Sequence, residues 1–144
     1  MRIAMTDLRL EDREQIYTLM TELEEEMLPR DRFDRAFDAY LQDEGVHCVV
    51  AREGNRAVGF ISVHARWLMH HSAPVCEVQE LIVSAGCRGK GIGRELLNAA
   101  KRIAETIGSP QLEVCCNVRN CSGQEFYQSC GMEWSHKKYI WKPE

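Results

Sequence analysis

The chain has 144 residues, of which 44% are hydrophobic and 28% are charged, and its formal net charge at pH 7 is −4. This length lies in the usual range of one domain, so we predict a single domain over residues 1–144. The negative net charge and the lack of a basic run argue against a nucleic-acid partner. No apolar run approaches the roughly 18 residues of a membrane span. The N-terminus also has no hydrophobic signal region, so we predict a cytoplasmic protein without a membrane partner.

The predicted elements follow one another without a repeat or a linker. Hydrophobic periodicity and turn residues predict, in chain order, a strand over residues 2–8, helices over 11–26 and 31–42, a β-hairpin over 46–52 and 57–67, a strand that ends at residue 83, a helix over 92–107, a strand over 111–116, a helix over 122–129 and a final strand over 134–141. The helix over 31–42 carries an aromatic stripe. We assign its Phe37 to the core and leave Phe33 and Tyr40 open between the core and a binding pocket.

A glycine-rich turn separates the strand that ends at residue 83 from the helix over 92–107. Its glycines allow backbone conformations that leave amide groups exposed around the start of the helix: Gly86, Gly89, Gly91 and Gly93. Arg88 and Lys90 add positive charge at the positive end of the helix dipole. The turn therefore predicts an anion site. Its spacing fits neither a P-loop nor a dinucleotide fingerprint.

Two motifs resemble those of the GNAT superfamily of N-acetyltransferases. The segment Arg88-Gly89-Lys90-Gly91-Ile92-Gly93 resembles that family's Arg-x-x-Gly-x-Gly pyrophosphate loop for acyl-CoA. A second motif matches at Asn120, Gly123, Tyr127 and Gly131, and the two motifs with the elements between them cover about half of the chain. The resemblance implies an α/β fold with a mixed sheet of about seven strands and helices on both faces. It also implies acetyl-CoA as the cosubstrate.

The resemblance also assigns the residues that bind the cosubstrate. Leu81, Ile82 and Val83 match the family's fourth strand, whose backbone pairs with the pantetheine arm. The full set of expected cofactor contacts is Leu81, Ile82, Val83, Arg88, Gly89, Lys90, Gly91, Ile92, Gly93, Arg94, Asn120 and Tyr127.

Transfer to an amine requires a base, because an alkyl ammonium near pH 7 cannot attack a thioester until it loses a proton. Glu77 and Glu80 are the candidates, and residues three apart on a strand point to opposite faces unless a bulge intervenes. The resemblance favours Glu77, with Glu80 as the alternative base or an acceptor-binding carboxylate. It assigns to Tyr127 the role of the acid that protonates the leaving thiolate.

A narrower and weaker resemblance, to aminoalkylphosphonate N-acetyltransferases, is carried by the histidines. It rests on His70-His71, on residues 77–83 and on Ser135-His136. We therefore predict a small primary amine with an anionic group as the acceptor. The acceptor-binding candidates are Arg66, His70, His71 and His136, with Arg119 and Lys137 as further cations.

Those enzymes are associated with a divalent metal, which gives four histidines a candidate ligand role: His64, His70, His71 and His136. We do not favour a metal, because adjacent histidines cannot both chelate one ion from an ideal strand. Two other functions stay open, a protein or peptide N-acetyltransferase and a noncatalytic acyl-CoA-binding regulatory module. The presence of Glu77 and Tyr127 argues against the second. Members of the GNAT superfamily often form dimers, so the resemblance is compatible with a homodimer.

Overall fold

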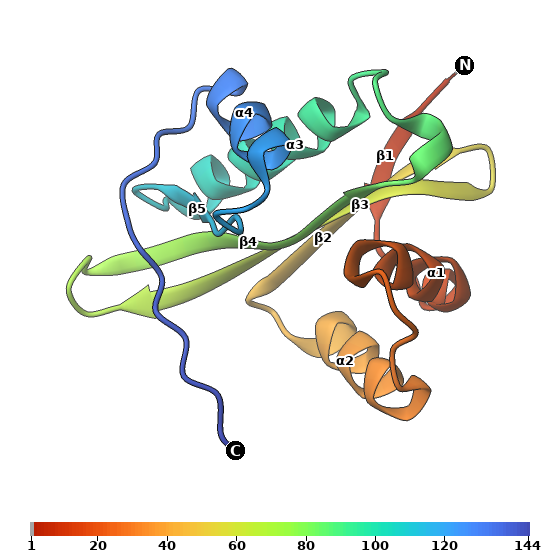
Figure 1. The fold of residues 1–144 in the computed structure, drawn as a ribbon, viewed down its shortest axis with the longest axis horizontal. Helices are drawn as coiled ribbons and strands as arrows, with labels where there is room; N and C mark the ends of the chain where they lie inside the picture. The colour runs from red at the N-terminus through yellow and green to blue at the C-terminus, as the bar shows by residue number, and fades with distance from the viewer. Residues whose placement is uncertain (1) are drawn as a thin grey trace. The chain divides into compact units, whose positions relative to one another are not determined.

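The computed structural model describes residues 2–144, which fall into two compact units divided between Glu113 and Val114. The first unit contains β1 (Ala4–Asp7), the 3-10 helix η1 (Leu10–Asp12), α1 (Arg13–Glu24), α2 (Arg30–Gln42), β2 (Val46–Glu53), β3 (Arg56–Leu68), β4 (Ala73–Val83), the 3-10 helix η2 (Ala85–Cys87) and α3 (Ile92–Ile107) (Figure 1). The strand β5 (Leu112–Val114) begins in this unit, and the second unit contains α4 (Cys121–Ser129). The prediction of a single domain stays a prediction.

The strands form a five-stranded sheet in the order β1-β2-β3-β4-β5, with antiparallel pairing from β1 through β4. This sheet and its helices confirm the α/β fold, although the described residues form five strands where the resemblance implies about seven. The strand predicted over residues 134–141 is wrong, because the structure has no strand there. A strand is stabilised by hydrogen bonds to a neighbouring strand. No strand pairing in the described part of the chain involves residues beyond β5.

Helices cover both faces of the sheet in the first unit, with α1 and α2 on one face and α3 on the other (Figure 1). Successive residues of a strand point to opposite faces, as Gly59 and Phe60 of β3 do. Gly59 faces α3 so closely that a Cβ there would lie 3.0 Å from Leu96 Cδ1 and 3.3 Å from Ile92 Cγ2. Phe60 packs instead in the cluster under α1 and α2. The implied arrangement of helices is therefore present in this unit.

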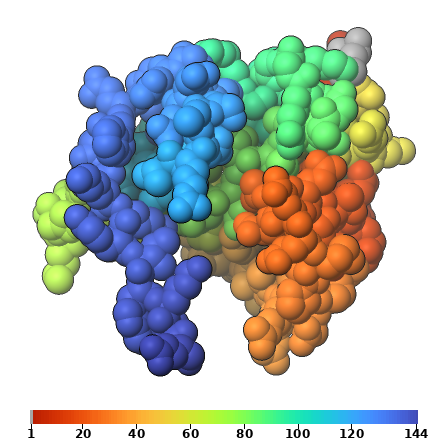
Figure 2. Space-filling model, in the orientation of Figure 1, coloured from red at the N-terminus to blue at the C-terminus, as the bar shows by residue number. Residues whose placement is uncertain are grey.

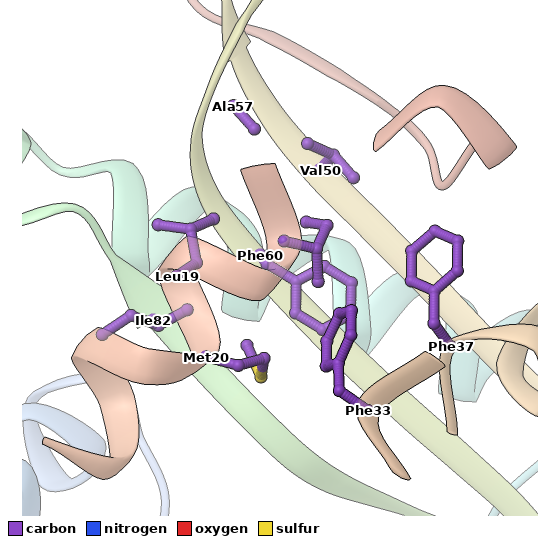
Figure 3. Close-up of a cluster of buried hydrophobic side chains, with 9 residues drawn as sticks. Leu19, Met20, Phe33, Phe37, Val50, Ala57, Phe60 and Ile82 are labelled. Atoms are coloured by element: carbon purple, nitrogen blue, oxygen red, sulfur yellow. The ribbon is translucent and has the colours of Figure 1, made fainter. Parts of the chain in front are cut away.

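The face under α1 and α2 holds a hydrophobic cluster (Figure 3). Its buried members are Ile16, Leu19, Met20, Phe33, Phe37, Val50, Ala57, Phe60 and Ile82. The ring centroids of Phe33 and Phe37 are 5.9 Å apart. Phe37 is thus a core residue as predicted, and Phe33, which the sequence left open, is a core residue as well. Figure 2 shows α1 and α2 side by side at the surface.

The second unit is organised around α4. Asn120 Oδ1 caps this helix by accepting a hydrogen bond from the Gly123 amide at 2.9 Å. Thiols exposed to solvent occur in this unit at Cys115 and Cys121. The cysteines of the first unit are half-buried or buried: Cys48, Cys76 and Cys87.

A buried ion pair fastens the start of α1 to β2. Arg52 donates from Nη1 to Asp12 Oδ1 at 2.7 Å and from Nη2 to Oδ2 at 2.6 Å, and both residues are almost fully buried. Burial raises the pKa of Asp12, but hydrogen bonds from Arg52 and from the Arg9 amide outweigh it and hold that pKa below its ordinary value. Arg52 Nε also donates to Thr6 Oγ1 at 2.6 Å, so the same side chain joins β1.

We expect Arg52→Met to lower the free energy of unfolding by about 3–5 kcal/mol near pH 7, because the Asp12 carboxylate would stay buried without its partner. The folded-state pKa of Asp12 is depressed. The pair's stabilisation is therefore present above the unfolded-state pKa and is lost as pH falls through the folded-state pKa. Urea unfolding between about pH 7 and about pH 3 measures both effects.

The control is Arg56→Met, at an exposed position at the start of β3, which should change the free energy of unfolding by less than about 0.5 kcal/mol. Equal destabilisation of the two variants would contradict a special role for the buried pair.

Candidate functional site

The glycine-rich loop connects β4 to α3. Gly89 and Gly91 have φ angles of +78° and +83°, a left-handed backbone that residues with a Cβ seldom adopt. The helix begins at Ile92, and the first amides of a helix have no acceptor within it. Arg88 Nε donates to the Val83 carbonyl at 3.0 Å, which anchors the loop to the end of β4. The loop therefore has the backbone and the helix start that favour an anion such as pyrophosphate.

A bulge interrupts β4 at Gln79. On the ladder between β3 and β4, Ser62 pairs with Glu80, but the next residue, Val63, pairs with Val78. Gln79 lies between Val78 and Glu80 and has no partner on β3. It is thus the extra residue of the bulge.

The bulge places Glu77 and Glu80 on the same face of the sheet. Glu80 is opposite Ser62 and Glu77 is opposite His64, and Ser62 and His64 share a face because they are two apart on β3. A bulge was the one arrangement in which residues three apart could share a face, and this bulge is present in β4. Both carboxylates lie on the face covered by α1 and α2.

Two hydroxyl groups from other elements hold Glu80. The Tyr40 hydroxyl of α2 donates to the carboxylate and lies 2.8 Å from Oε1 and 3.0 Å from Oε2. Ser62 Oγ also contacts Oε1, and it accepts a hydrogen bond from the Glu80 amide at 3.1 Å. Burial, reinforced by the Glu80 charge, raises the pKa of Tyr40 far above its ordinary value, so its hydroxyl keeps its proton. Glu80 is thus a carboxylate with a fixed position.

Glu80 lines a pocket of about 320 Å³ that is formed mainly by α1 and α2. This volume is within the range of small-molecule sites, about 300–1,000 Å³. Its walls are largely apolar and include Met20, Phe33 and Phe60, which lie close together in Figure 3. Its polar and charged members are Glu24, Arg32, Tyr40 and Glu80.

A larger pocket of about 560 Å³ lies along β2 and α3. Its lining includes none of the residues predicted to act in catalysis or to bind the cosubstrate. Because the smaller pocket contains the fixed carboxylate of Glu80, it is the candidate site for the acceptor.

Tyr127 lies half-buried on α4 in the second unit. Burial, and to a lesser degree Cys116 and Cys130, raises the pKa of its phenol to about 12, so the phenol is protonated at neutral pH and has a proton to donate. A Cβ at Gly123 would lie 2.9 Å from both Asn120 Cγ and Cys116 Sγ. This crowding explains why the motif has a small residue three positions after Asn120.

The cationic residues predicted to bind the acceptor are not brought into either described pocket. Arg66, His70 and His71 lie toward the tip of the β3–β4 hairpin, where the two histidine rings are 4.4 Å apart between centroids. Neither pocket is lined by them. His136 is exposed in the second unit. Their roles stay predictions.

Sequence reasoning missed two of the residues around Glu80. Arg32 lines the pocket from the first turn of α2, and Ser62 contacts the carboxylate from β3. An arginine on an exposed helix turn and a serine within an apolar strand carry no signal of such a role. The aromatic stripe of α2 was the one available signal, and it left Tyr40 open.

Comparison with known families matches residues 13–132 to the acetyltransferase (GNAT) family. The chain belongs to the GNAT family. It is accordingly an acetyl-CoA-dependent N-acetyltransferase, and the recognition from the two motifs is confirmed. An aminoalkylphosphonate N-acetyltransferase from Salmonella typhimurium is 33% identical over 129 residues, covering 90% of this chain and 84% of the relative.

Solved structures of acetyltransferases share the fold of this GNAT chain. AAC(6')-Iy in complex with the bisubstrate analogue CoA-S-monomethyl-acetylneamine has a TM-score of 0.89 at 18% identity, with coverage of 100% of this chain and 99% of that one. Glucosamine-6-phosphate N-acetyltransferase from Arabidopsis thaliana has a TM-score of 0.84 at 17% identity, and the match covers 100% of both chains. At these identities the likeness establishes the fold alone.

Residues 2–144 contain neither a cluster of metal ligands nor a membrane-spanning helix. Within them, no three or more His, Cys, Asp and Glu side chains gather in a way that would hold a metal ion. No helix among the same residues has the length and apolar character to span a bilayer.

We expect Gly91→Val to weaken acetyl-CoA binding by about tenfold or more, or about 1.4 kcal/mol. A β-branched residue is strained by about 1–2 kcal/mol in a left-handed backbone, and relief of this strain would move the loop amides. No atom lies within 4 Å of the position of the added Cβ, so the folded protein has room for it. Calorimetric titration with acetyl-CoA measures the change.

The matched control is Gly86→Val. Gly86 also has no atom within 4 Å of an added Cβ, but its backbone is not left-handed. If a folded Gly91→Val protein bound acetyl-CoA with wild-type affinity, the loop would not be part of the cosubstrate site.

Proposed function

We propose that this chain transfers an acetyl group from acetyl-CoA to the primary amine of a small molecule bound in the Glu80 pocket. The observation that carries the proposal is the fixed carboxylate of Glu80 at a pocket of about 320 Å³. A carboxylate in a largely apolar pocket attracts an ammonium group, and the volume suits a small molecule better than a peptide.

Three residues would divide the chemistry. Glu80 pairs with the acceptor ammonium, because two hydroxyl groups hold its carboxylate in a fixed position at the pocket. Glu77 receives the proton that the ammonium must lose, directly or through water. The neutral amine then attacks the thioester carbonyl, the C–N bond forms and the C–S bond breaks. Tyr127 donates its phenol proton to the leaving thiolate. The second proton, which the nitrogen loses as the amide forms, returns through solvent to the Tyr127 phenolate.

Arg32 supports an acceptor that carries an anionic group. Two other arginines of this region are paired with acids, since Arg13 lies 2.6 Å from Asp38 and Arg30 lies 2.5 Å from Glu14. Arg32 lines the same pocket as Glu80, and no ion pair recorded for the described residues involves it.

A pocket with a carboxylate and a guanidinium suits an acceptor with an ammonium and an anion. The relative named for aminoalkylphosphonates supports the same choice. We therefore propose aminoalkylphosphonates as the first acceptors to test.

Replacement of Tyr127 by Phe should lower kcat by about 100-fold or more, the usual contribution of a general acid. The affinity for acetyl-CoA should change little, since the proton matters mainly in the transition state. Thiol release measured under saturating substrates gives kcat, and calorimetry gives the affinity. Tyr139→Phe, at an exposed tyrosine of the same unit, is the control. If Tyr127→Phe kept the wild-type kcat, a group other than Tyr127 would be the general acid.

Arg32→Gln should lower kcat/KM for 2-aminoethylphosphonate by about tenfold or more, because a charge-assisted hydrogen bond contributes about 1.5–3 kcal/mol. The kcat/KM for propylamine, which has no anionic group, should stay within about twofold. Arg35→Gln, at an exposed position of α2 outside the pocket lining, should change neither value. A wild-type preference for spermidine over 2-aminoethylphosphonate would contradict the anionic acceptor.

A further inference from the structure

His64 has a buried nitrogen that no group in the described structure satisfies. Its Nε2 atom is buried and has no hydrogen-bond partner. In the first unit, Glu53 Oε2 is also buried without a hydrogen-bond partner. An unsatisfied buried polar atom costs about 1–3 kcal/mol. Native proteins satisfy most such atoms, so an exception at a candidate site points to a water or to a function.

The position of His64 is next to the Glu80 site. It shares a face of β3 with Ser62, and its partner on β4 is Glu77. Paired residues on neighbouring strands have Cβ atoms about 4.5–5.5 Å apart. The His64 ring also packs edge-to-face against Tyr40, with 4.9 Å between centroids and 76° between planes. Tyr40 in turn donates to Glu80, so His64 neighbours Glu77 across the ladder and contacts the tyrosine that holds Glu80.

The charged and titratable groups around His64 come from several elements. They are Tyr40 of α2, Asp43 just after α2, Arg66 of β3, and Glu77 and Glu80 of β4. Burial is the largest effect and lowers the pKa of His64, although Glu80 acts in the opposite direction. At neutral pH the imidazole is therefore uncharged and has a nitrogen that can accept a proton.

We propose that His64 is a proton relay, whose Nε2 binds a water and passes the acceptor's proton from the ammonium at Glu80 to Glu77. This inference rests on the proposed function. In each turnover one ammonium N–H bond breaks, and the proton crosses the water to Nε2. It then passes to the Glu77 carboxylate and to solvent, so the imidazole ends uncharged.

Glu80 is a poor candidate for the same step, because hydrogen bonds from Tyr40 and Ser62 already occupy its carboxylate oxygens. A water at His64 has the required surroundings. Buried waters bind two to four polar groups, about three on average, and Nε2, the Glu77 carboxylate and the acceptor ammonium supply three. His64 thus acts through a water and through Glu77 and is a positioning residue in this reaction.

The test is His64→Gln, which keeps a polar side chain but removes the group that accepts a proton. Its kcat with 2-aminoethylphosphonate should fall by about 100-fold. Burial lowers the pKa of His64, so the wild-type kcat should decline only at a pH below 6.5, the ordinary pKa of histidine. This decline should be absent from the variant. His47→Gln on β2 is the control, because His47 is a half-buried histidine outside the Glu80 pocket.

A second acceptor separates a relay from a structural role. The amino group of an alkoxyamine such as 2-(aminooxy)ethylphosphonate is already uncharged at neutral pH and needs no base before it attacks. His64→Gln should therefore retain its kcat with this acceptor to within about threefold of wild type.

An equal loss with both acceptors, or no loss with either, would overturn the relay. Circular dichroism and acetyl-CoA affinity verify that the variant is folded, and His64→Asn repeats the comparison if it is not. A wild-type protein that acetylates neither acceptor would overturn the proposed function itself.

Discussion

The bulge at Gln79 is the constraint on which the candidate site depends. With regular alternation, residues 77 and 80 would lie on opposite faces of β4, and one carboxylate would face α3. The extra residue turns both toward α1 and α2, where the pocket lies. A bulge also opens the ladder locally, and the Glu80 amide uses this freedom to donate to Ser62 Oγ. One inserted residue thus provides both the direction of the carboxylates and a support for one of them.

The groups around Glu80 come from distant parts of the chain. Tyr40 lies on α2, Ser62 on β3 and Glu80 on β4, with 40 residues between the first and the last. Such a site exists only when α2 is docked on the sheet, and the hydrophobic cluster beneath the helix provides that docking. The buried Asp12–Arg52 pair fixes the start of α1 in the same way. Folding of the chain therefore fixes the position of the Glu80 carboxylate before any acceptor binds.

The sequence predicted the helices and the loop well because their signals are local. The spacing of apolar residues located α3. Of the four glycines that the sequence marked in the loop, Gly89 and Gly91 have a left-handed backbone. The bulge had no signature, because a register shift depends on both strands. Arg32 and Ser62 were missed for the same reason, since tertiary contacts give them their roles. The strand predicted over residues 134–141 failed because alternation does not supply a neighbouring strand.

The uneven exposure of the cysteines makes the two units chemically distinguishable. Cys115 and Cys121 are exposed in the second unit, while Cys76 and Cys87 of the first are buried. Burial raises the pKa of the Cys48 thiol to about 12, and a protonated thiol reacts slowly with electrophiles. A maleimide dye or spin probe would therefore attach to the native chain on the unit that carries Tyr127, and its signal would follow that unit as acetyl-CoA binds.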